Sequence, residues 1–480
     1  MTKLIGRQAE IEEMMCRYHS GNPEFIVVYG RRRVGKTFLI KELFQNQFAF
    51  QHTGLSPVDK NKKVTKTDQL KSFYFSLLQY GLEDSACPKD WIEAFFLLEQ
   101  LLERKSNGQR QVVFIDELPW LDTPRSGFMS AFEGFWNGWA NYHDEIFLVV
   151  CGSATSWISD KLIMAKGGLY GRLTDKIKLS PFTLKECDEF YKSRNIKLQA
   201  YDVVEGYMAM GGIPYYMDYF MPGLSLSQNI DRLFFTKNAK LQNEFNQLFG
   251  SIFTNADDMK RIVRFLGNRH AGYTRNEIAK ALDIGSGGYL SDQLKSLEES
   301  DFVTRYVPFG VSARCEHYKL CDNFCWFWLH FKDDNAKLSE DFWQVNHSKP
   351  SLNSWRGIAF EEVCFGHVAQ IKQALGIAGV TTKVSSYIAK GDKNTEGMQI
   401  DMLIDRDDRV INLCEMKFVK GQFVVDDNYR RKVDGRVQAL MDLTSKNIHS
   451  TLITTDGLHY NEYSGTFQKT VTIDALFNLT

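Results

Sequence analysis

The stretch Phe25–Ile40 reads FIVVYGRRRVGKTFLI and decides the fold of the first part of the chain. It joins a short apolar, β-branched run to the pattern GxxxxGKT, and a helix-forming segment follows. That order predicts a strand, a phosphate-binding loop and a helix. The backbone N–H groups of such a loop close around a phosphate, and the helix N-terminus adds a favourable dipole. We therefore predict a nucleotide site here.

The residues of this loop have distinct expected roles. Lys36 would reach the β- and γ-phosphates, and the Thr37 hydroxyl would bind magnesium. The backbone that wraps the phosphates would come from Gly30, Arg31, Arg32, Arg33, Val34 and Gly35. The alternative is a Gly- and Lys-containing loop that arises by chance. The strand before it and the helix after it argue against that alternative.

Length and composition limit the other possibilities. The 480 residues suffice for about three domains. With 58 Lys and Arg against 59 Asp and Glu, no overall charge indicates nucleic acid or membrane, so any nucleic-acid contact must come from local patches. The first residues lack the apolar segment of a secretory signal, and no apolar run reaches the roughly 18 residues of a membrane span. Nine scattered cysteines favour a reducing cytoplasm.

A second apolar run, QVVFIDE at residues 111–117, ends in two carboxylates. Asp116 would hold the magnesium through water, and Glu117 could polarise the attacking water as a general base. Paired acids at the end of a strand are often only solvated turn residues. Their position downstream of a matching phosphate loop favours the catalytic interpretation.

Two further polar positions follow predicted strands. Ser153, after the run 145–151, could contact the γ-phosphate or the water. Arg172 precedes the run 176–179 and could neutralise transition-state charge in its own site or a neighbour's. An ordinary surface arginine is equally plausible there. Because strands alternate with helices, we expect a parallel sheet covered on both faces, with the ligand at the carboxyl ends of the strands.

The strings GRRRVGKT, VVFIDELPWL, CGSATSW and LYGRLT together resemble the archaeal-type ATPase family, in the AAA+/STAND-related branch of P-loop NTPases. Residues 4–10 open a predicted amphipathic helix that reaches about Tyr18. Within them, Gly6–Glu10 is similar to the family's GRxxE start. Arg7 and Glu10 could pack beside the nucleotide or simply open a solvated helix. The resemblance covers roughly residues 1–250 and implies ATP. It implies a core over 1–180 and a helical lid over 181–252, whose GGIPY element makes Pro214 a candidate nucleotide contact.

Residues 253–335 change pattern. Three helical segments, the second with a Thr274/Glu277 capping box, precede a predicted hairpin and indicate a winged helix-turn-helix. Its third helix would offer DNA the side chains of Ser286, Tyr289, Ser291, Gln293 and Lys295. This segment is nearly charge-balanced, and its acidic end repels phosphate. A protein–protein or intramolecular spacer is therefore as plausible as a DNA reader.

Residues 340–480 carry a second set of charged side chains. Glu361 lies in a predicted helix, Asp401 in a predicted strand, and Glu415 and Lys417 in the strand that follows. Because side chains alternate along a strand, Glu415 and Lys417 share one face, and pairing across the turn brings Asp401 beside them. Asp401 and Glu415 would bind magnesium with the Met416 carbonyl, and Glu361 would contact the metal through water.

Lys417 would orient or deprotonate the attacking water and stabilise the developing charge. The alternative is a charged hairpin on the surface, since ExK by itself is common. The order helix Glu, strand Asp, ExK resembles the PD-(D/E)xK nuclease superfamily, with Glu361 or Glu362 in the first acidic position. Basic residues at 429–436 could track a phosphodiester backbone or form a solvated face.

The sequence thus predicts a multidomain α/β chain: a P-loop NTPase parallel sheet with a helical lid, a winged helix, and a small α/β PD-(D/E)xK nuclease-like domain. The predicted function is ATP hydrolysis with a magnesium-dependent DNA endonuclease-like domain in the cytoplasm. The alternative is an ATP-driven switch or DNA-binding regulator whose nuclease-like domain is an inactive docking module. A homo-oligomer is possible, because Arg172 in trans would require one.

Overall fold

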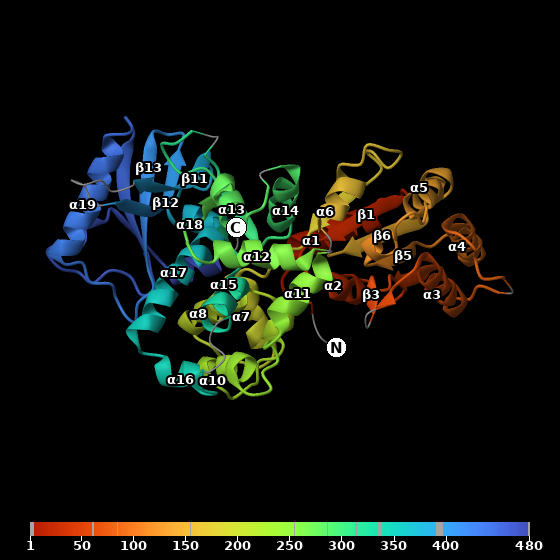
Figure 1. Cartoon of the computed structure of the whole chain (residues 1–480), viewed down its shortest axis with the longest axis horizontal. Helices are drawn as coiled ribbons and strands as arrows, with labels where there is room; N and C mark the ends of the chain where they lie inside the picture. Colours follow the sequence, from red (N-terminus) through yellow and green to blue (C-terminus); the bar gives the residue numbers. More distant parts are fainter. Residues whose placement is uncertain are drawn as a thin grey trace. The chain divides into compact units, whose positions relative to one another are not determined.

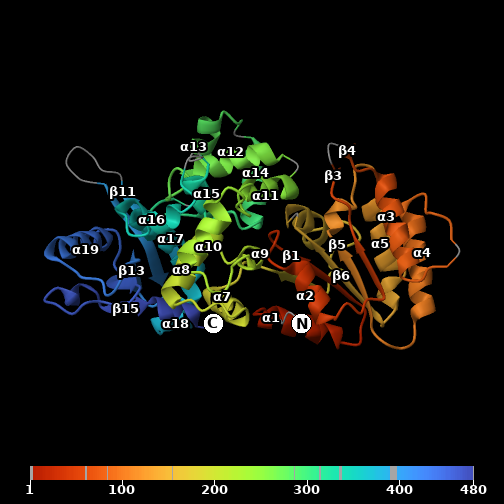
Figure 2. The ribbon, with the colours of Figure 1, turned by 90° about the horizontal axis from the view of Figure 1, so that it is seen from below.

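The computed structural model describes residues 4–59, 62–83, 85–153, 155–253, 255–285, 287–312, 315–333, 338–389 and 397–478 (Figures 1 and 2). The chain divides into two compact units. The first comprises Met1–Ser180, Gly250–Ala256 and Glu299–Asp301, and the second comprises Pro181–Phe249, Asp257–Glu298 and Phe302–Thr480. The finer division of the second unit into lid, winged helix and nuclease-like domain stays a prediction.

The first unit is built on a five-stranded parallel sheet with the order β2-β5-β6-β1-β7. The strands are β1 (Glu24–Tyr29), β2 (Phe50–Thr53), β5 (Gln111–Asp116), β6 (Ile146–Gly152) and β7 (Asp175–Lys178). β5 and β6 are buried along their whole length because the sheet is covered on both faces. The predicted parallel sheet of a P-loop NTPase is confirmed.

Helices cover the two faces of this sheet (Figure 2). On one face lie α1 (Gln8–Tyr18) and α2 (Lys36–Leu43). The rings of Tyr18, the last residue of α1, and Phe44, which directly follows α2, contact Phe147 of β6. On the other lie α3 (Lys66–Gln79), α4 (Trp91–Lys105) and α5 (Phe128–Gly138), which share an apolar core with the strands. The prediction that the first helix opens near Leu4 is wrong, because Gly6 and Arg7 have left-handed backbones at φ 62° and 61°.

His52 of β2 makes the stability of this unit depend on pH. It is 2% exposed, and burial lowers its pKa from 6.5 to about 4. The contribution of neutral His52 is therefore fully present above pH 6.5 and is lost as the pH falls through 4. Between pH 7 and 4, urea unfolding should show wild type losing about 3 kcal/mol more than His52→Phe. Equal losses would contradict this.

The second unit begins with helices, as predicted: α7 (Leu184–Ser193), α8 (Ala200–Met210), α9 (Pro214–Met217), α10 (Leu226–Ile230) and α11 (Glu244–Ile252). α8 packs against α15 (Asn323–Phe331) and α17 (Pro350–Gly366). The helical segment predicted as a lid therefore shares its core with elements much later in the chain. Residues 181–249 of this segment belong to the same compact unit as they do, whereas residues 250–252, the end of α11, belong to the first unit.

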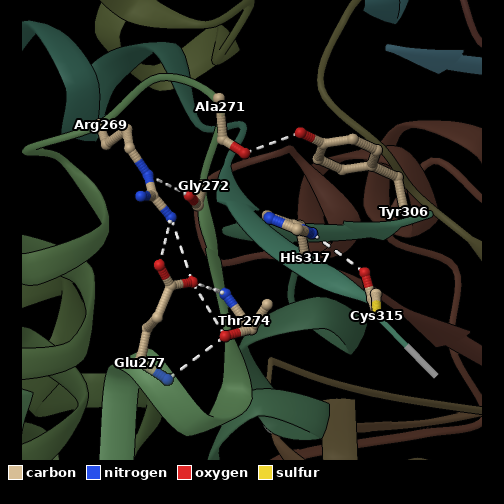
Figure 3. A network of polar contacts seen from close by, with 8 residues as sticks. All are labelled: Arg269, Ala271, Gly272, Thr274, Glu277, Tyr306, Cys315 and His317. Carbon is tan, nitrogen blue, oxygen red and sulfur yellow. Dashed lines mark hydrogen bonds and ion pairs between the residues drawn. The ribbon is translucent and has the colours of Figure 1, made fainter. Parts of the chain in front are cut away.

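A helix–hairpin module occupies residues 256–320. It consists of α12 (Ala256–Leu266), α13 (Arg275–Leu282), α14 (Gly288–Glu299), β9 (Val303–Tyr306) and β10 (His317–Leu320), with β8 (Tyr273–Thr274) completing an antiparallel sheet in the order β8-β10-β9. The predicted capping box is confirmed, since the Glu277 carboxylate accepts from the Thr274 backbone N–H at 2.7 Å (Figure 3). Ser286 lies outside the described residues.

The C-terminal part carries a five-stranded mixed sheet with the order β11-β12-β13-β14-β15. Its strands are β11 (Thr382–Ala389), β12 (Met398–Arg406), β13 (Val410–Lys417), β14 (Asn447–Thr454) and β15 (Lys469–Thr472). β12 pairs antiparallel with β13, and β13 pairs parallel with β14. α17 packs against β13, and α19 (Asp427–Met441) packs against β14. The helix and the two strands predicted to carry acids are therefore all present.

Candidate active sites

The phosphate loop lies between β1 and α2, where only glycine fits at two positions. Gly30 has φ 135° and Gly35 has φ 96°, values that other residues rarely adopt. A Cβ on Gly30 would lie 2.2 Å from the carbonyl oxygen of Leu179, which follows β7. The loop therefore passes directly against the neighbouring strand end. This close approach leaves its backbone N–H groups at the carboxyl edge of the sheet.

Lys36 lies inside this loop. Its side chain is 6% exposed, and its Nζ donates to the carbonyl oxygens of Gly30 at 2.9 Å and Arg31 at 3.0 Å. Burial lowers the pKa of Lys36, while Glu117, Cys151 and Asp116 act in the opposite direction. The ammonium group is thus held by two carbonyls at the mouth of the loop, from which it can turn to a phosphate.

Thr37 and Asp116 meet at the start of α2 and the end of β5. The Thr37 hydroxyl donates to Asp116 Oδ2 at 2.9 Å, and the Cys151 thiol lies 2.6 Å from Asp116 Oδ1. Burial and the Asp116 charge raise the pKa of Cys151, so it stays a neutral thiol. An adjacent hydroxyl and carboxylate are the oxygen donors that magnesium takes, so these residues fit the expected ion. Sequence reasoning did not assign Cys151 a role.

Glu117 directly follows β5 and has a left-handed backbone at φ 49°. Ser153, at the end of β6, donates to both of its carboxylate oxygens, from the hydroxyl at 2.7 Å and from the backbone N–H at 3.2 Å. The predicted contact of Ser153 with the γ-phosphate or the water stays a prediction. In this structure Ser153 holds the candidate general base in place, at the edge where the ligand is expected.

Arg7 belongs beside the loop and not on a solvated helix. Its guanidinium is buried and donates to the carbonyl oxygens of Val34 at 3.3 Å and Ser180 at 2.6 Å.

Two further predicted nucleotide contacts lie elsewhere. Arg172 is exposed in a turn after Gly171. Pro214 is the first residue of α9 in the second unit. The roles predicted for Arg172 and Pro214 stay predictions.

Comparison with known proteins agrees with this arrangement. Residues 4–220 match the family described as an ATPase domain predominantly from Archaea. This part of the chain is an archaeal-type ATPase domain.

Several proteins are similar to the chain that carries this ATPase domain. An uncharacterised protein of Methanocaldococcus jannaschii is 26% identical over 397 residues, which cover 81% of this chain and 82% of that protein. An uncharacterised ATP-binding protein of the same archaeon is 40% identical over 43 residues, 9% of this chain and 73% of its own length. A Walker-type ATPase of Pyrococcus abyssi has a TM-score of 0.47 at 16% identity, over 68% of this chain and 96% of that one.

No helix in the described residues is long and apolar enough to cross a membrane.

A second group of acids lies on the C-terminal sheet. β12 pairs with β13 through Met402 and Cys414, and continuing this register by one residue places Asp401 opposite Glu415. Burial, together with the charges of Glu361 and Glu415, raises the pKa of Asp401 to about 6. The Asp401 carboxylate therefore lies close enough to the other two to be repelled by both, an arrangement that a divalent cation would relieve.

Glu415 is almost fully buried and engages the helix α19. Tyr429 donates its hydroxyl to Oε2 at 2.7 Å, and Arg436 forms an ion pair with Oε1. Lys417 lies with its Nζ 5.5 Å from the centre of the Tyr429 ring. The sequence left two alternatives for the basic residues of this helix, contacts to a phosphodiester backbone or a solvated face. In the structure, Arg436 pairs with Glu415, and Arg430 pairs with two aspartates of the same helix.

The two glutamates of α17 have different surroundings. Glu361 contacts His270 Nδ1 at 3.1 Å, and its charge helps to raise the pKa of Asp401. Glu362 is buried against Lys319 and His270. Glu361 is therefore the glutamate that belongs with Asp401 and Glu415, and we call these three residues the acid group. Within the part of the chain that the structure describes, no three His, Cys, Asp or Glu side chains are arranged to hold a metal ion. A metal here would also need the Met416 carbonyl or water.

Proposed function

We propose that the archaeal-type ATPase domain works with a magnesium-dependent, DNA endonuclease-like site on the C-terminal sheet. The observation that carries the second half is the gathering of Glu361 and Glu415 around Asp401, whose pKa rises to about 6. Lys417 lies two residues beyond Glu415 on the same strand. A metal-dependent nuclease needs carboxylates to hold the metal ion, and a lysine beside them can stabilise the charge that develops during cleavage.

In the ATPase domain, Lys36 would bind the β- and γ-phosphates of ATP with the backbone of the loop. Thr37 and Asp116 would hold magnesium, which neutralises charge on the phosphates. Glu117, kept in place by Ser153, would accept a proton from the attacking water. Arg172 and Pro214 would complete the nucleotide contacts. ATP binding would order the lid and change the placement of the parts that follow.

At the C-terminal sheet, Asp401 and Glu415 would hold the ion with the Met416 carbonyl, and Glu361 would act through water. Magnesium there would lower the pKa of a bound water and polarise a phosphodiester. Lys417 would orient that water and stabilise the negative charge that develops. The helix–hairpin module, as a winged helix, would add contacts to DNA from α14.

One observation favours a second candidate, an ATP-driven switch with an inactive docking domain. Both oxygens of Glu415 already have protein donors, Tyr429 and Arg436. A metal ion at Glu415 must compete with the positive charge of Arg436. If Arg436 stays paired with Glu415, no metal ion binds there. The domain would then bind a partner and would not cut DNA.

Asp401→Asn in the full-length chain distinguishes the two functions. Cleavage of plasmid DNA in magnesium or manganese should fall at least about 100-fold, while ATP turnover is unchanged. Asp405→Asn is the matched control, since Asp405 lies on the same strand and pairs with Lys446 at 2.5 Å, away from the acid group. The control should cut like wild type. Wild-type protein that hydrolyses ATP but leaves DNA intact with either metal would favour the switch.

A further inference from the structure

The loop between α12 and β8, residues 267–272, is held by hydrogen bonds on both sides of His270 (Figure 3). Arg269 donates to the Gly272 carbonyl at 2.6 Å and pairs with Glu277 at 3.1 Å. The Tyr306 hydroxyl donates to the Ala271 carbonyl at 2.7 Å. Gly272 has φ 69°, and a Cβ there would lie 2.3 Å from the Tyr318 carbonyl oxygen. The sheet of the helix–hairpin module thus fixes the backbone that carries His270.

His270 leaves this loop toward α17 and joins its two glutamates. The ring nitrogen Nδ1 lies 3.1 Å from Glu361, and Nε2 lies 2.6 Å from Glu362. The side chain is 13% exposed, and Trp326 packs edge-on against the ring at 5.8 Å. Each glutamate therefore meets a different nitrogen of one imidazole.

We propose that His270 is a positioning residue of the nuclease-like site and that it keeps Glu361 directed toward Asp401. Like charges repel, so Asp401 and Glu415 push the Glu361 carboxylate away from the acid group. The contact of Glu361 with His270, whose loop is held by hydrogen bonds on both sides, opposes this movement. This inference rests on the proposed function of the C-terminal sheet. It makes the metal site composite, because a residue before β8 supports acids that lie after residue 340.

The competing interpretation is that His270 serves only to neutralise buried Glu362. Lys319, a neighbour in the same module, already forms an ion pair with Glu362 and is itself 7% exposed. Glu362 therefore has a cation besides His270. The two ring nitrogens provide a way to separate these roles. The asparagine side chain can replace Nδ1 alone, and the longer glutamine side chain can replace Nε2 alone.

His270→Asn places an amide N–H near the position of Nδ1 and can retain the polar contact with Glu361. His270→Gln places its amide near Nε2 and can retain only the polar contact with Glu362. Both variants, with His270→Ala, are made in the full-length chain. Manganese affinity is measured by titration calorimetry, DNA cleavage is followed in parallel, and ATP turnover and the thermal midpoint report folding.

We expect His270→Asn to bind manganese within about threefold of wild type. His270→Gln and His270→Ala should bind it about 10- to 100-fold more weakly, the usual cost of losing a residue that orients a metal ligand. If His270→Gln matches wild type and His270→Asn does not, or if all three bind like wild type, His270 does not position Glu361. Asp401→Asn is titrated alongside as the site-specific control. If its titration is identical to that of wild type, the wild-type protein binds no manganese at this site. The proposed nuclease function is then wrong, and so is this inference.

Discussion

Replacing Glu117 with glutamine is expected to slow ATP turnover about 100- to 10,000-fold, the range for losing a general base. Nucleotide binding should persist, because the phosphate loop and Lys36 are untouched. Glutamine has the size of glutamate and can still accept from Ser153, whose hydroxyl lies 2.7 Å from the carboxylate. The backbone at residue 117 should therefore stay as it is, and only the ability to take a proton is lost.

Phosphate release and binding of a fluorescent ATP analogue, measured on the same preparation, check this expectation. Glu83→Gln is a suitable control, because Glu83 is a surface acid that meets only the exposed Arg104 in a long contact of 3.8 Å among the pairs described. Ser153→Ala should reduce turnover less than Glu117→Gln, since it loosens the base without removing it. Normal turnover in Glu117→Gln would assign the base to another residue.

Replacing Glu205 with alanine is expected to destabilise the second unit by about 3–5 kcal/mol, because it leaves a buried arginine without its counter-ion. Glu205 of α8 is fully buried and accepts from Arg356 of α17 at 2.6 and 3.0 Å and from Trp343 at 3.1 Å. Burial alone would raise the pKa of Glu205, but His347 and Arg356 outweigh it and lower the pKa. The carboxylate is thus charged in the folded chain.

Urea unfolding followed by tryptophan fluorescence measures this loss. The double variant Glu205→Leu with Arg356→Met should recover most of it, because a buried ion pair can be replaced by apolar side chains of similar volume. Asp188→Ala is the matched control in α7, where Asp188 meets the exposed Lys192, and it should cost no more than about 1 kcal/mol. A single Glu205→Ala variant as stable as this control would show that the Arg356 charge finds another partner or water.

Short-range signals predicted the ATPase half well. The strand, loop and helix around Lys36 follow from neighbouring residues, since the β-branched run and the glycines act within one or two turns of chain. The same holds for Asp116 and Glu117 at the end of β5, and for the Thr274 cap of α13. The predicted start of α1 was wrong because Gly6 and Arg7 have left-handed backbones, and the Arg7 side chain bonds to Val34 and Ser180, which lie far along the chain.

The amino-acid sequence alone determined that this chain carries a parallel nucleotide-binding sheet and that acids lie on a later helix and two strands. Only the tertiary structure decided which partners those side chains have: Ser153 for Glu117, Arg436 for Glu415, His270 for Glu361. The physical reason is that secondary structure follows local periodicity, whereas the pairing of buried charges depends on which distant elements pack together. The local sequence around one residue of such a pair does not identify its distant partner.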